Sequence, residues 1–183
     1  YTLLSKLGER ENRLTVGASY DGGRTHFVQD SQGAVLSADR GTIGATDFER
    51  TTDVDTNNDY FGLFATDTFA LNSNTFLTLA GRYNHAKVKL SDNIGTELNG
   101  DHTFNRFNPA VGLNWNPSAM FNTWFGYNEG MRAPSPVELT CADPGAPCKL
   151  PNAFLADPPL KPVVSKTFEV GTRGAITNNL SYT

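Results

Sequence analysis

Cysteine, methionine and tryptophan are scarce in this chain of 183 residues, which contains two of each. Long hydrophobic runs are missing: no uninterrupted apolar stretch approaches the ~18 residues that a membrane-spanning helix requires. Basic runs are missing too, and the formal net charge is −4. This argues against nucleic acid as a partner, because phosphate binding requires a basic surface. A transmembrane β-barrel remains possible, since its strands carry apolar residues only at alternate positions.

The motifs of common enzymes are also absent. The sequence has neither a Gly-x-Ser-x-Gly elbow nor a His-Glu-x-x-His motif, and no glycine-rich phosphate loop follows a predicted strand. Asp53 and Asp55 resemble the start of a calcium loop, but Asn58 and Phe64 replace the glycine and the glutamate that such a loop needs. We therefore expect an acidic loop rim that leads into a strand, with no catalytic activity, no metal and no cofactor.

Apolar and polar residues alternate through much of the chain. The segments with this pattern are 14–21, 60–71, 75–84, 105–115, 121–128 and 168–173. In 105–115, for example, Val111 and Leu113 share one parity, and Gly112 and Asn114 share the other. A period of two residues predicts strands with one apolar and one polar face, and the richness in aromatic residues and Thr agrees with it. The sequence is therefore expected to be all-β.

The predicted connections alternate between short and long. Short ones are expected at 8–12, 72–74, 116–119 and 177–179, and long ones at about 22–58, 91–103 and 132–164. This alternation is typical of an outer-membrane barrel, whose periplasmic turns are short and whose extracellular loops are long. The sequence thus predicts a segment of an antiparallel transmembrane β-barrel. A soluble antiparallel sandwich or barrel stays open, because its strands alternate in the same way.

Both cysteines, Cys141 and Cys148, lie within the predicted loop 132–164. Eight of the ten prolines fall there as well, between Pro134 and Pro162. Proline fixes φ and has no amide hydrogen, so this segment is neither a helix nor a central strand. In an exported protein the two cysteines are expected to form a disulfide that restricts the loop. A metal site is disfavoured, because no histidine lies nearby to complete a set of four ligands.

A series of short motifs follows the chain from residue 60 to residue 174. After the strand-like segments 60–71, 77–84 and 107–118 come Tyr127, Arg132-Ala133-Pro134, Glu138-Leu139, Asp157-Pro158-Pro159-Leu160 and Phe168-Glu169-Val170-Gly171-Thr172-Arg173. In this order the motifs resemble the C-terminal half of TonB-dependent outer-membrane receptors. Each motif alone is weak, and their shared order over most of residues 60–174 carries the resemblance.

The resemblance implies an importer of a metal chelate, with a ferric siderophore as the first expectation, in the outer membrane of a Gram-negative bacterium. Such a receptor holds an N-terminal plug inside a barrel of about 22 strands. A TonB complex that binds a short N-terminal box powers it. Residues 1–183 would be a partial β-barrel domain of about seven to eight strands, without plug, box or remaining strands. The implied partners are the chelate, outer-membrane lipid and, through the absent N-terminal part, TonB.

Ligand binding in such a receptor would fall to loop 132–164 and to the strand end before it. The candidate residues are Tyr127, Arg132, Glu138, Lys149 and Asn152. Arginine and lysine suit an anionic chelate, and an aromatic ring suits its organic shell. These residues are therefore expected to contact the ligand, with Tyr127 at the base of the loop.

Two other functions stay open at this stage. A complete barrel of about eight strands would fill its interior with side chains, and would have a structural or adhesive role in the outer membrane. A soluble, secreted β-sandwich would be a binding module. Dependence on detergent and heat-modifiable gel mobility would distinguish either barrel from the sandwich.

Overall fold

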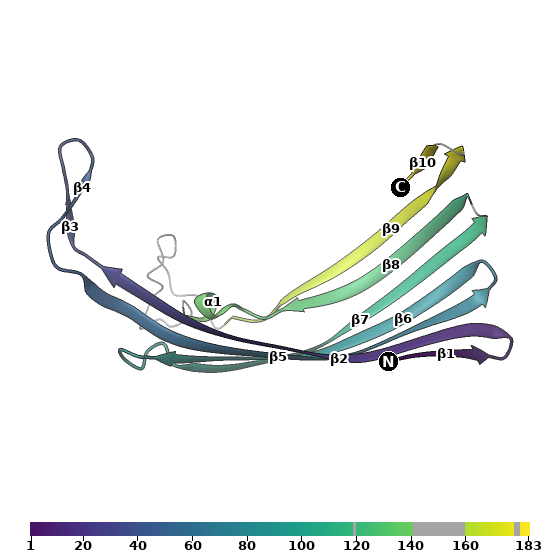
Figure 1. Ribbon diagram of the computed structural model, residues 1–183, viewed down its shortest axis with the longest axis horizontal. Helices are drawn as coiled ribbons and strands as arrows, with labels where there is room; N and C mark the ends of the chain where they lie inside the picture. The colour runs from purple at the N-terminus through teal and green to yellow at the C-terminus, as the bar shows by residue number, and fades with distance from the viewer. Residues whose placement is uncertain (119, 141–159, 178–179) are drawn as a thin grey trace.

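One antiparallel sheet, bent like a trough, extends along the whole molecule (Figure 1). The computed structural model describes residues 1–118, 120–140, 160–177 and 180–183. Its elements are β1 (Thr2–Leu7), β2 (Arg10–Ser31), β3 (Ala34–Leu36), β4 (Thr42–Gly44), β5 (Glu49–Asn72), β6 (Thr75–Asp92), β7 (Gly100–Ser118), β8 (Phe121–Arg132), α1 (Pro136–Thr140), β9 (Val163–Thr177) and β10 (Leu180–Tyr182). Eight strands form the sheet in the order β1-β2-β5-β6-β7-β8-β9-β10. The prediction of an all-β, antiparallel segment is confirmed.

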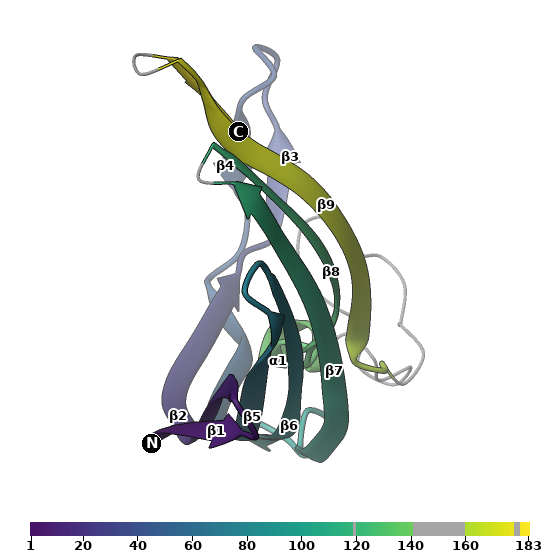
Figure 2. The same ribbon diagram turned by 90° about the vertical axis from the view of Figure 1, so that its right-hand side faces the viewer.

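The sheet is a single layer with two open edges. β1 and β10 occupy those edges and do not pair with each other in the described part of the chain (Figure 2). The other described sheet is the two-stranded β3–β4 ribbon, which projects away at one end (Figure 1). The described strands thus neither close into a small barrel nor stack as two sheets, which disfavours both alternatives left open by the sequence.

Short turns join the strands at one end of the sheet, and longer connections join them at the other (Figure 1). In the β1–β2 turn, Gly8 adopts a φ of 70°, a left-handed conformation that favours glycine. The longer connections are shorter than predicted, because β2 continues to Ser31, β5 begins at Glu49 and β7 begins at Gly100. The expected alternation of short and long connections is confirmed, and the expected bounds of the loops 22–58 and 91–103 are wrong.

The extension of β2 escaped the sequence pattern because water surrounds it. β2 and β5 have 22 and 24 residues, about twice the number that a tilted membrane crossing requires. Residues 21–31 of β2 are largely exposed on both faces. Nothing imposes an apolar–polar alternation on such a ribbon, so the sequence there looks like a loop.

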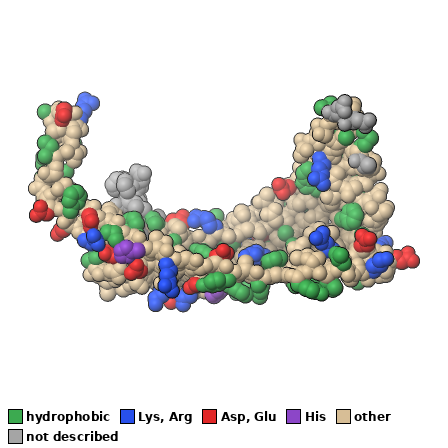
Figure 3. Space-filling view, in the orientation of Figure 1, with side chains coloured by type: hydrophobic (Ala, Val, Ile, Leu, Met, Phe, Trp, Pro, Cys, Tyr) green, Lys and Arg blue, Asp and Glu red, His purple; other side chains and the backbone are tan. Residues whose placement is uncertain are grey.

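The convex face of the sheet is apolar over part of its length. Successive rows of side chains are apolar from the Tyr20–Phe61 pair to the Phe69–Leu77 pair, and we call this stretch the apolar band. Its exposed side chains include Leu63, Leu79, Tyr83, Phe107, Leu113, Phe125 and Val170. Figure 3 shows hydrophobic side chains along this convex underside. The stretch of β5 inside the band agrees with the roughly nine to eleven residues of a tilted membrane strand.

The helix α1 lies over the concave face of the sheet (Figure 1). The register of the strands also places many polar side chains on this face. At the height of the apolar band these side chains include Thr15, Ser19, Thr66, Thr68, Thr78, Arg82, Asn84, Asn108, Asn114 and Asn122. A polar face opposite an apolar one is expected for a barrel wall between a wet interior and lipid. Among the described residues, no helix is long and apolar enough to cross a membrane.

Asp67, Asn12 and His85 are polar members of the rows that form the apolar band. Asn12 Nδ2 donates a hydrogen bond to Asp67 Oδ1 at 2.6 Å, and Ser5 Oγ donates to Asn12 Oδ1 at 3.1 Å. Asn12 is 8% exposed, and its amide gives one oxygen of the Asp67 carboxylate a hydrogen-bond partner. Asp67 therefore belongs to a polar network of β1, β2 and β5 near the short-turn end of the sheet.

The two faces predict opposite responses to charge at neighbouring positions of β5. Ala65 lies in the middle of the apolar band, and Thr66 faces the concave side. We expect Ala65→Arg to lower the free energy of unfolding of the complete protein in lipid vesicles by about 2–4 kcal/mol, because a charge then meets hydrocarbon. Thr66→Arg, the matched control, should cost less than about 1 kcal/mol. Urea titration of both variants measures the difference, and equal losses would contradict the assignment of the faces.

Candidate functional site

The chain leaves β8 through a charged pair that fixes the start of α1. Arg132 Nη1 and Nη2 donate to Glu138 Oε2 and Oε1 at 2.9 and 3.0 Å. Two parallel bonds between a guanidinium and a carboxylate define both distance and orientation. The side chains are 57% and 41% exposed, so water screens the pair, and its role is more geometric than energetic.

A capping box completes the start of α1. The Glu138 amide donates to Ser135 Oγ at 3.3 Å, while the Ser135 amide and hydroxyl donate to Glu138 Oε2 at 2.7 and 2.9 Å. Pro136 occupies the first helical position, where a missing amide hydrogen costs nothing. A helix of only five residues is thereby held in one orientation relative to β8.

The same contacts keep Glu138 ionised. The Arg132 guanidinium, followed by the amide and the hydroxyl of Ser135, lowers the pKa of the Glu138 carboxyl to about 2. Glu138 also raises the pKa of Arg132. Both groups therefore stay charged over the whole physiological range, and each neutralises the other.

Leu139 anchors α1 to the concave wall. Its side chain is 7% exposed and packs with Val54 of β5 and with Val88 and Leu90 of β6. Leu160, on the far side of segment 141–159, packs against the same cluster, as do Tyr60, Leu98 and Phe104. We call Val54, Val88, Leu90 and Leu139 the anchor cluster. The described residues on both sides of 141–159 thus lie on one patch of the concave wall.

The structure brings together two of the predicted ligand residues, Arg132 and Glu138. Tyr127 lies at the base of the segment but on the parity of the convex face, where its ring is 4.7 Å from that of Phe168. Lys149, Asn152 and the cysteines Cys141 and Cys148 lie outside the described residues.

A second charged group, centred on Glu129, was missed from the sequence. The Glu129 side chain is 11% exposed, is bonded to Arg106, accepts from the Tyr127 hydroxyl, and lies 3.7 Å from Lys166 Nζ. The β7–β8 ladder ends at Ala110–Asn128, beside Pro109, which has no amide hydrogen to donate. Beyond that point Glu129 joins β7 to β8 through side chains. A proline inside a predicted strand was the signal that could have indicated this gap.

The concave wall next to Glu129 holds a shallow hollow of about 370 Å³. Arg82 lies across it: Nε donates to Asn84 Oδ1 at 2.7 Å and Nη2 to Ser19 Oγ at 2.6 Å. Phe64 supports the guanidinium at 5.9 Å from its ring centre. Gly62 makes room for it, because a Cβ there would lie 2.2 Å from Nη2. The hollow is thus lined by a guanidinium that Asn84, Ser19 and Phe64 hold in a fixed position.

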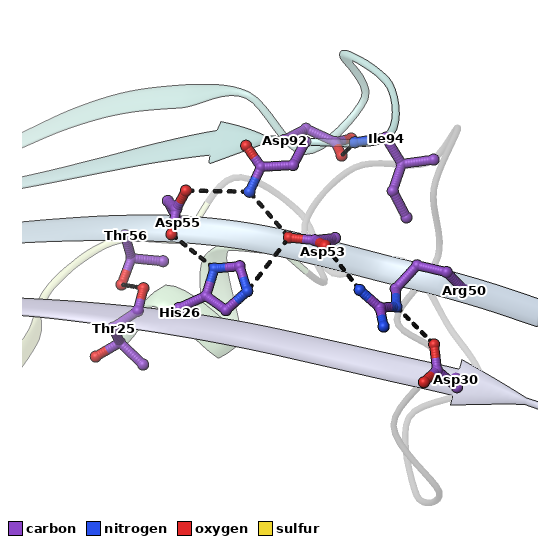
Figure 4. Close-up of polar contacts among 10 residues, drawn as sticks. Thr25, His26, Asp30, Arg50, Asp53, Asp55, Thr56, Asp92 and Ile94 are labelled. Atoms are coloured by element: carbon purple, nitrogen blue, oxygen red, sulfur yellow. Dashed lines mark hydrogen bonds and ion pairs between the residues drawn. The ribbon is translucent and has the colours of Figure 1, made fainter.

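An acidic network lies on the convex side of β2 and β5, beyond the apolar band (Figure 4). His26 Nδ1 is 2.7 Å from Asp55 Oδ1, and His26 Nε2 is 3.6 Å from Asp53 Oδ1. Asn93 Nδ2 donates to Asp53 and Asp55 at 2.9 and 3.0 Å and so lowers the pKa of both carboxyls. Arg50 joins Asp53 to Asp30 at 3.0 and 2.6 Å. The network fastens β2, β5 and the end of β6 together.

This network corrects the expectation of an acidic loop rim. Residues 53–59 belong to the interior of β5, and their alternation reflects the period of a strand. Within the described ranges, no group of three or more His, Cys, Asp or Glu side chains is placed to hold a metal ion.

Comparison with known protein families gives one match over the whole chain. The model of the family "TonB dependent receptor-like, beta-barrel" matches residues 1–183. No curated protein sequence matches the chain.

Several solved structures share the fold. The siderophore receptor PiuA from Acinetobacter baumannii is similar over 97% of this chain and 28% of its own, with a TM-score of 0.61 and 16% identity. BauA, the ferric preacinetobactin receptor from the same organism, is similar over 96% of this chain and 25% of its own, with a TM-score of 0.59 and 16% identity. Fiu, the ferric-catecholate import receptor from E. coli K12, is similar over 97% of this chain and 28% of its own, with a TM-score of 0.58 and 13% identity. The chain therefore spans about a quarter of their length, and at such identities the likeness shows the fold alone.

The Glu138 contacts predict that docking of α1 depends on pH. The pKa of Glu138 falls from 4.5 to about 2 on folding, so its stabilising contribution is complete above pH 4.5 and is lost as the pH falls towards 2. We expect hydrogen exchange at the Leu139 amide, which donates to the Ser135 carbonyl at 3.0 Å, to accelerate over this interval. Glu138→Gln should exchange faster at pH 7 and lose this acid dependence.

Two further variants test the same contacts. Ser135→Ala removes the cap and should lower the free energy of local opening by about 0.5–2 kcal/mol. Glu169→Gln, on the concave side of β9 and without an ion pair to a described residue, should leave exchange at Leu139 unchanged. An acid response of Leu139 that persists in Glu138→Gln would contradict this account.

Proposed function

The chain belongs to the β-barrel family of TonB-dependent receptors, and from this premise we propose that it forms part of the wall of an outer-membrane importer of a metal chelate, specifically a ferric siderophore. Members of the family lie in the outer membrane of Gram-negative bacteria and are transporters, not enzymes. The localisation and the lack of catalysis expected from the sequence are thereby confirmed. The chelate, the TonB partner and the architecture of the complete receptor belong to the proposal.

One observation carries the proposal: the chain beyond β8 turns to the concave face of a wall whose other face is apolar. Leu139 and Leu160 root it on the anchor cluster, at the end of the sheet where the longer connections lie. In an outer-membrane barrel that end faces the outside of the cell. Leu139 and Leu160 would thus lie at the entrance to the lumen of the proposed barrel, where an incoming solute has to pass.

A siderophore is the proposed cargo because solved structures with this fold are described as receptors for siderophores or ferric catecholates. The chemistry of the segment agrees with an anionic chelate. Arg132 is neutralised by Glu138, so it positions the segment, while Lys149 and Asn152 remain the candidates for direct contact. We further propose that Cys141 and Cys148 form a disulfide within this segment, which thiol titration of the oxidised protein tests.

The domain proposal follows from the coverage of the solved structures. Because the chain spans about a quarter of each, we propose that residues 1–183 are part of a barrel domain completed by further strands of a longer protein. A plug and a segment that binds TonB would also come from that protein. A chain of several times 19.9 kDa in outer-membrane fractions, detected with an antibody to residues 141–154, is the expected result.

Uptake measurements on the complete receptor test the function. A strain without the receptor should lose uptake of radiolabelled iron supplied as a ferric catecholate or hydroxamate, and so should a strain without TonB. Lys149→Ala with Asn152→Ala should weaken chelate binding roughly 10–100-fold, because at least one charge-assisted contact is lost. Arg132→Gln should affect exchange at Leu139 more than affinity.

Supply of cobalamin in place of iron chelates is the control for cargo. If the receptor takes up cobalamin and no iron chelate, its cargo is cobalamin and not a siderophore. Normal iron uptake from every chelate in the strain without the receptor would contradict the proposal that the protein imports iron chelates.

A further inference from the structure

Basic side chains occupy the convex face just beyond the apolar band, towards the outside of the cell. The Tyr20–Phe61 row closes the band, and the next row contains Asp59 opposite Lys87. The row after that contains Arg24 and Lys89 on either side of Asn57. We call Arg24, Lys87 and Lys89 the basic triad. Figure 3 shows basic side chains on this part of the underside, between the hydrophobic run and the acidic end.

The triad has more positive charge than its neighbours neutralise. Lys87 Nζ lies 3.1 Å from Asp101, and Asp59 accepts from the Tyr20 hydroxyl at 2.5 Å. The side chains of Arg24 and Lys89 are exposed, and neither forms a hydrogen bond or an ion pair with the described part of the chain, although Asp101 lies opposite Lys89 in the β6–β7 ladder. Two extended cations thus face outward next to a surface that lies in lipid.

The spacing of the triad suits one phosphate-bearing headgroup. Lys87 and Lys89 point to the same side of β6 about 7 Å apart, and Arg24 lies two strands from Lys89, about 10 Å away. Long flexible side chains span such distances and extend towards a membrane interface while their stems cover apolar surface. Asn57, half-buried between Arg24 and Lys89, adds an amide donor. Guanidinium and ammonium groups bind phosphate oxygens through charge-assisted hydrogen bonds.

The position of the basic triad indicates that the phosphate belongs to a membrane lipid and not to a solute in the lumen. The triad lies on the face opposite to the concave wall, so a solute that crosses the lumen does not meet it. The next row outward contains His26 and Asp55 of the acidic network, which repels anions and limits the site on that side. Between hydrocarbon and this network, only the headgroup layer of the membrane touches the triad.

We propose that Arg24, Lys87 and Lys89 bind the phosphate groups of an outer-leaflet lipid at the rim of the apolar band. The site goes beyond the import function and does not depend on which chelate is carried. It would hold the wall at a fixed height in the membrane and cover the exposed stretch of β2 and β6 with an annular lipid.

Lipid binding to the complete receptor in detergent tests the proposal. The probe is lipid A, a phosphorylated glycolipid, titrated by native mass spectrometry, with its dephosphorylated form and inorganic phosphate as comparisons. We expect the triple variant Arg24→Gln, Lys87→Gln, Lys89→Gln to raise the Kd for lipid A at least tenfold. Removal of the lipid phosphates should weaken binding to wild type to a similar extent.

A matched variant controls for loss of charge. Lys6→Gln, Arg13→Gln, Arg173→Gln removes three cations of the concave parity and should change the Kd less than twofold. Heat-modifiable gel mobility verifies that each variant folds. If the triple variant does not fold, lipid A binding is measured on the single variant Lys89→Gln, whose position is exposed. A several-fold rise in Kd is then expected.

Three results would overturn the site. They are unchanged lipid A binding by the folded triple or single variant, equal binding of the dephosphorylated lipid, and full competition by millimolar inorganic phosphate. The last would identify a site for free phosphate instead of one for a membrane lipid.

Discussion

The hydrogen-bond ladder of the single-layer sheet is the constraint on which the rest of the molecule depends. Hydrocarbon offers no partner to a free amide, so a strand inside the apolar band has to be bonded to its neighbours. The ladder also fixes the register, and the register decides by parity which side chains meet lipid and which meet the wet interior. Ala65 and Thr66 are consecutive residues in opposite surroundings for this reason. Asp67 remains possible on the apolar side because Asn12 supplies the hydrogen bond that lipid cannot.

Side chains take over where the ladder stops. β7 and β8 are no longer paired beyond Ala110–Asn128, where Pro109 has no amide hydrogen, and Glu129 then joins Arg106 to Lys166 across the strands. Two cations thus compensate a carboxylate that is only 11% exposed. β8 continues beyond the gap, paired with β9 as far as Arg132. The β7–β8 ladder therefore ends at Asn128, only a few residues before β8 itself ends at Arg132 and the segment towards α1 begins.

The sequence predicted what a period of two can encode, namely the strands inside the apolar band, the order of short and long connections, and the family. It failed for residues 21–31, which are largely exposed on both faces and show no alternation, and for residues 49–59, whose alternating Asp residues resemble a calcium loop. At the site, the role of Arg132 and Glu138 as ligand contacts stays a prediction, and their pairing with each other was not foreseen. Ser135-Pro136-Val137-Glu138 is itself a capping-box signature, so that signal was present. The anchor cluster was not predictable, because Leu139 meets Val54 and Val88 only through the curvature of the sheet.

Because Arg132 pairs with Glu138, anchoring of the segment after β8 and recognition of a ligand fall to different residues. A cation already held by two short hydrogen bonds has little left to offer an anionic ligand, and releasing it would leave Glu138 without its strongest partner. Arg132, Ser135 and Leu139 therefore determine where the segment begins on the wall. In the proposed receptor, selection of the chelate then depends on side chains beyond α1, such as Lys149 and Asn152. Anchoring and recognition can thus change independently, because no residue of the anchor cluster carries a charge that a ligand could use.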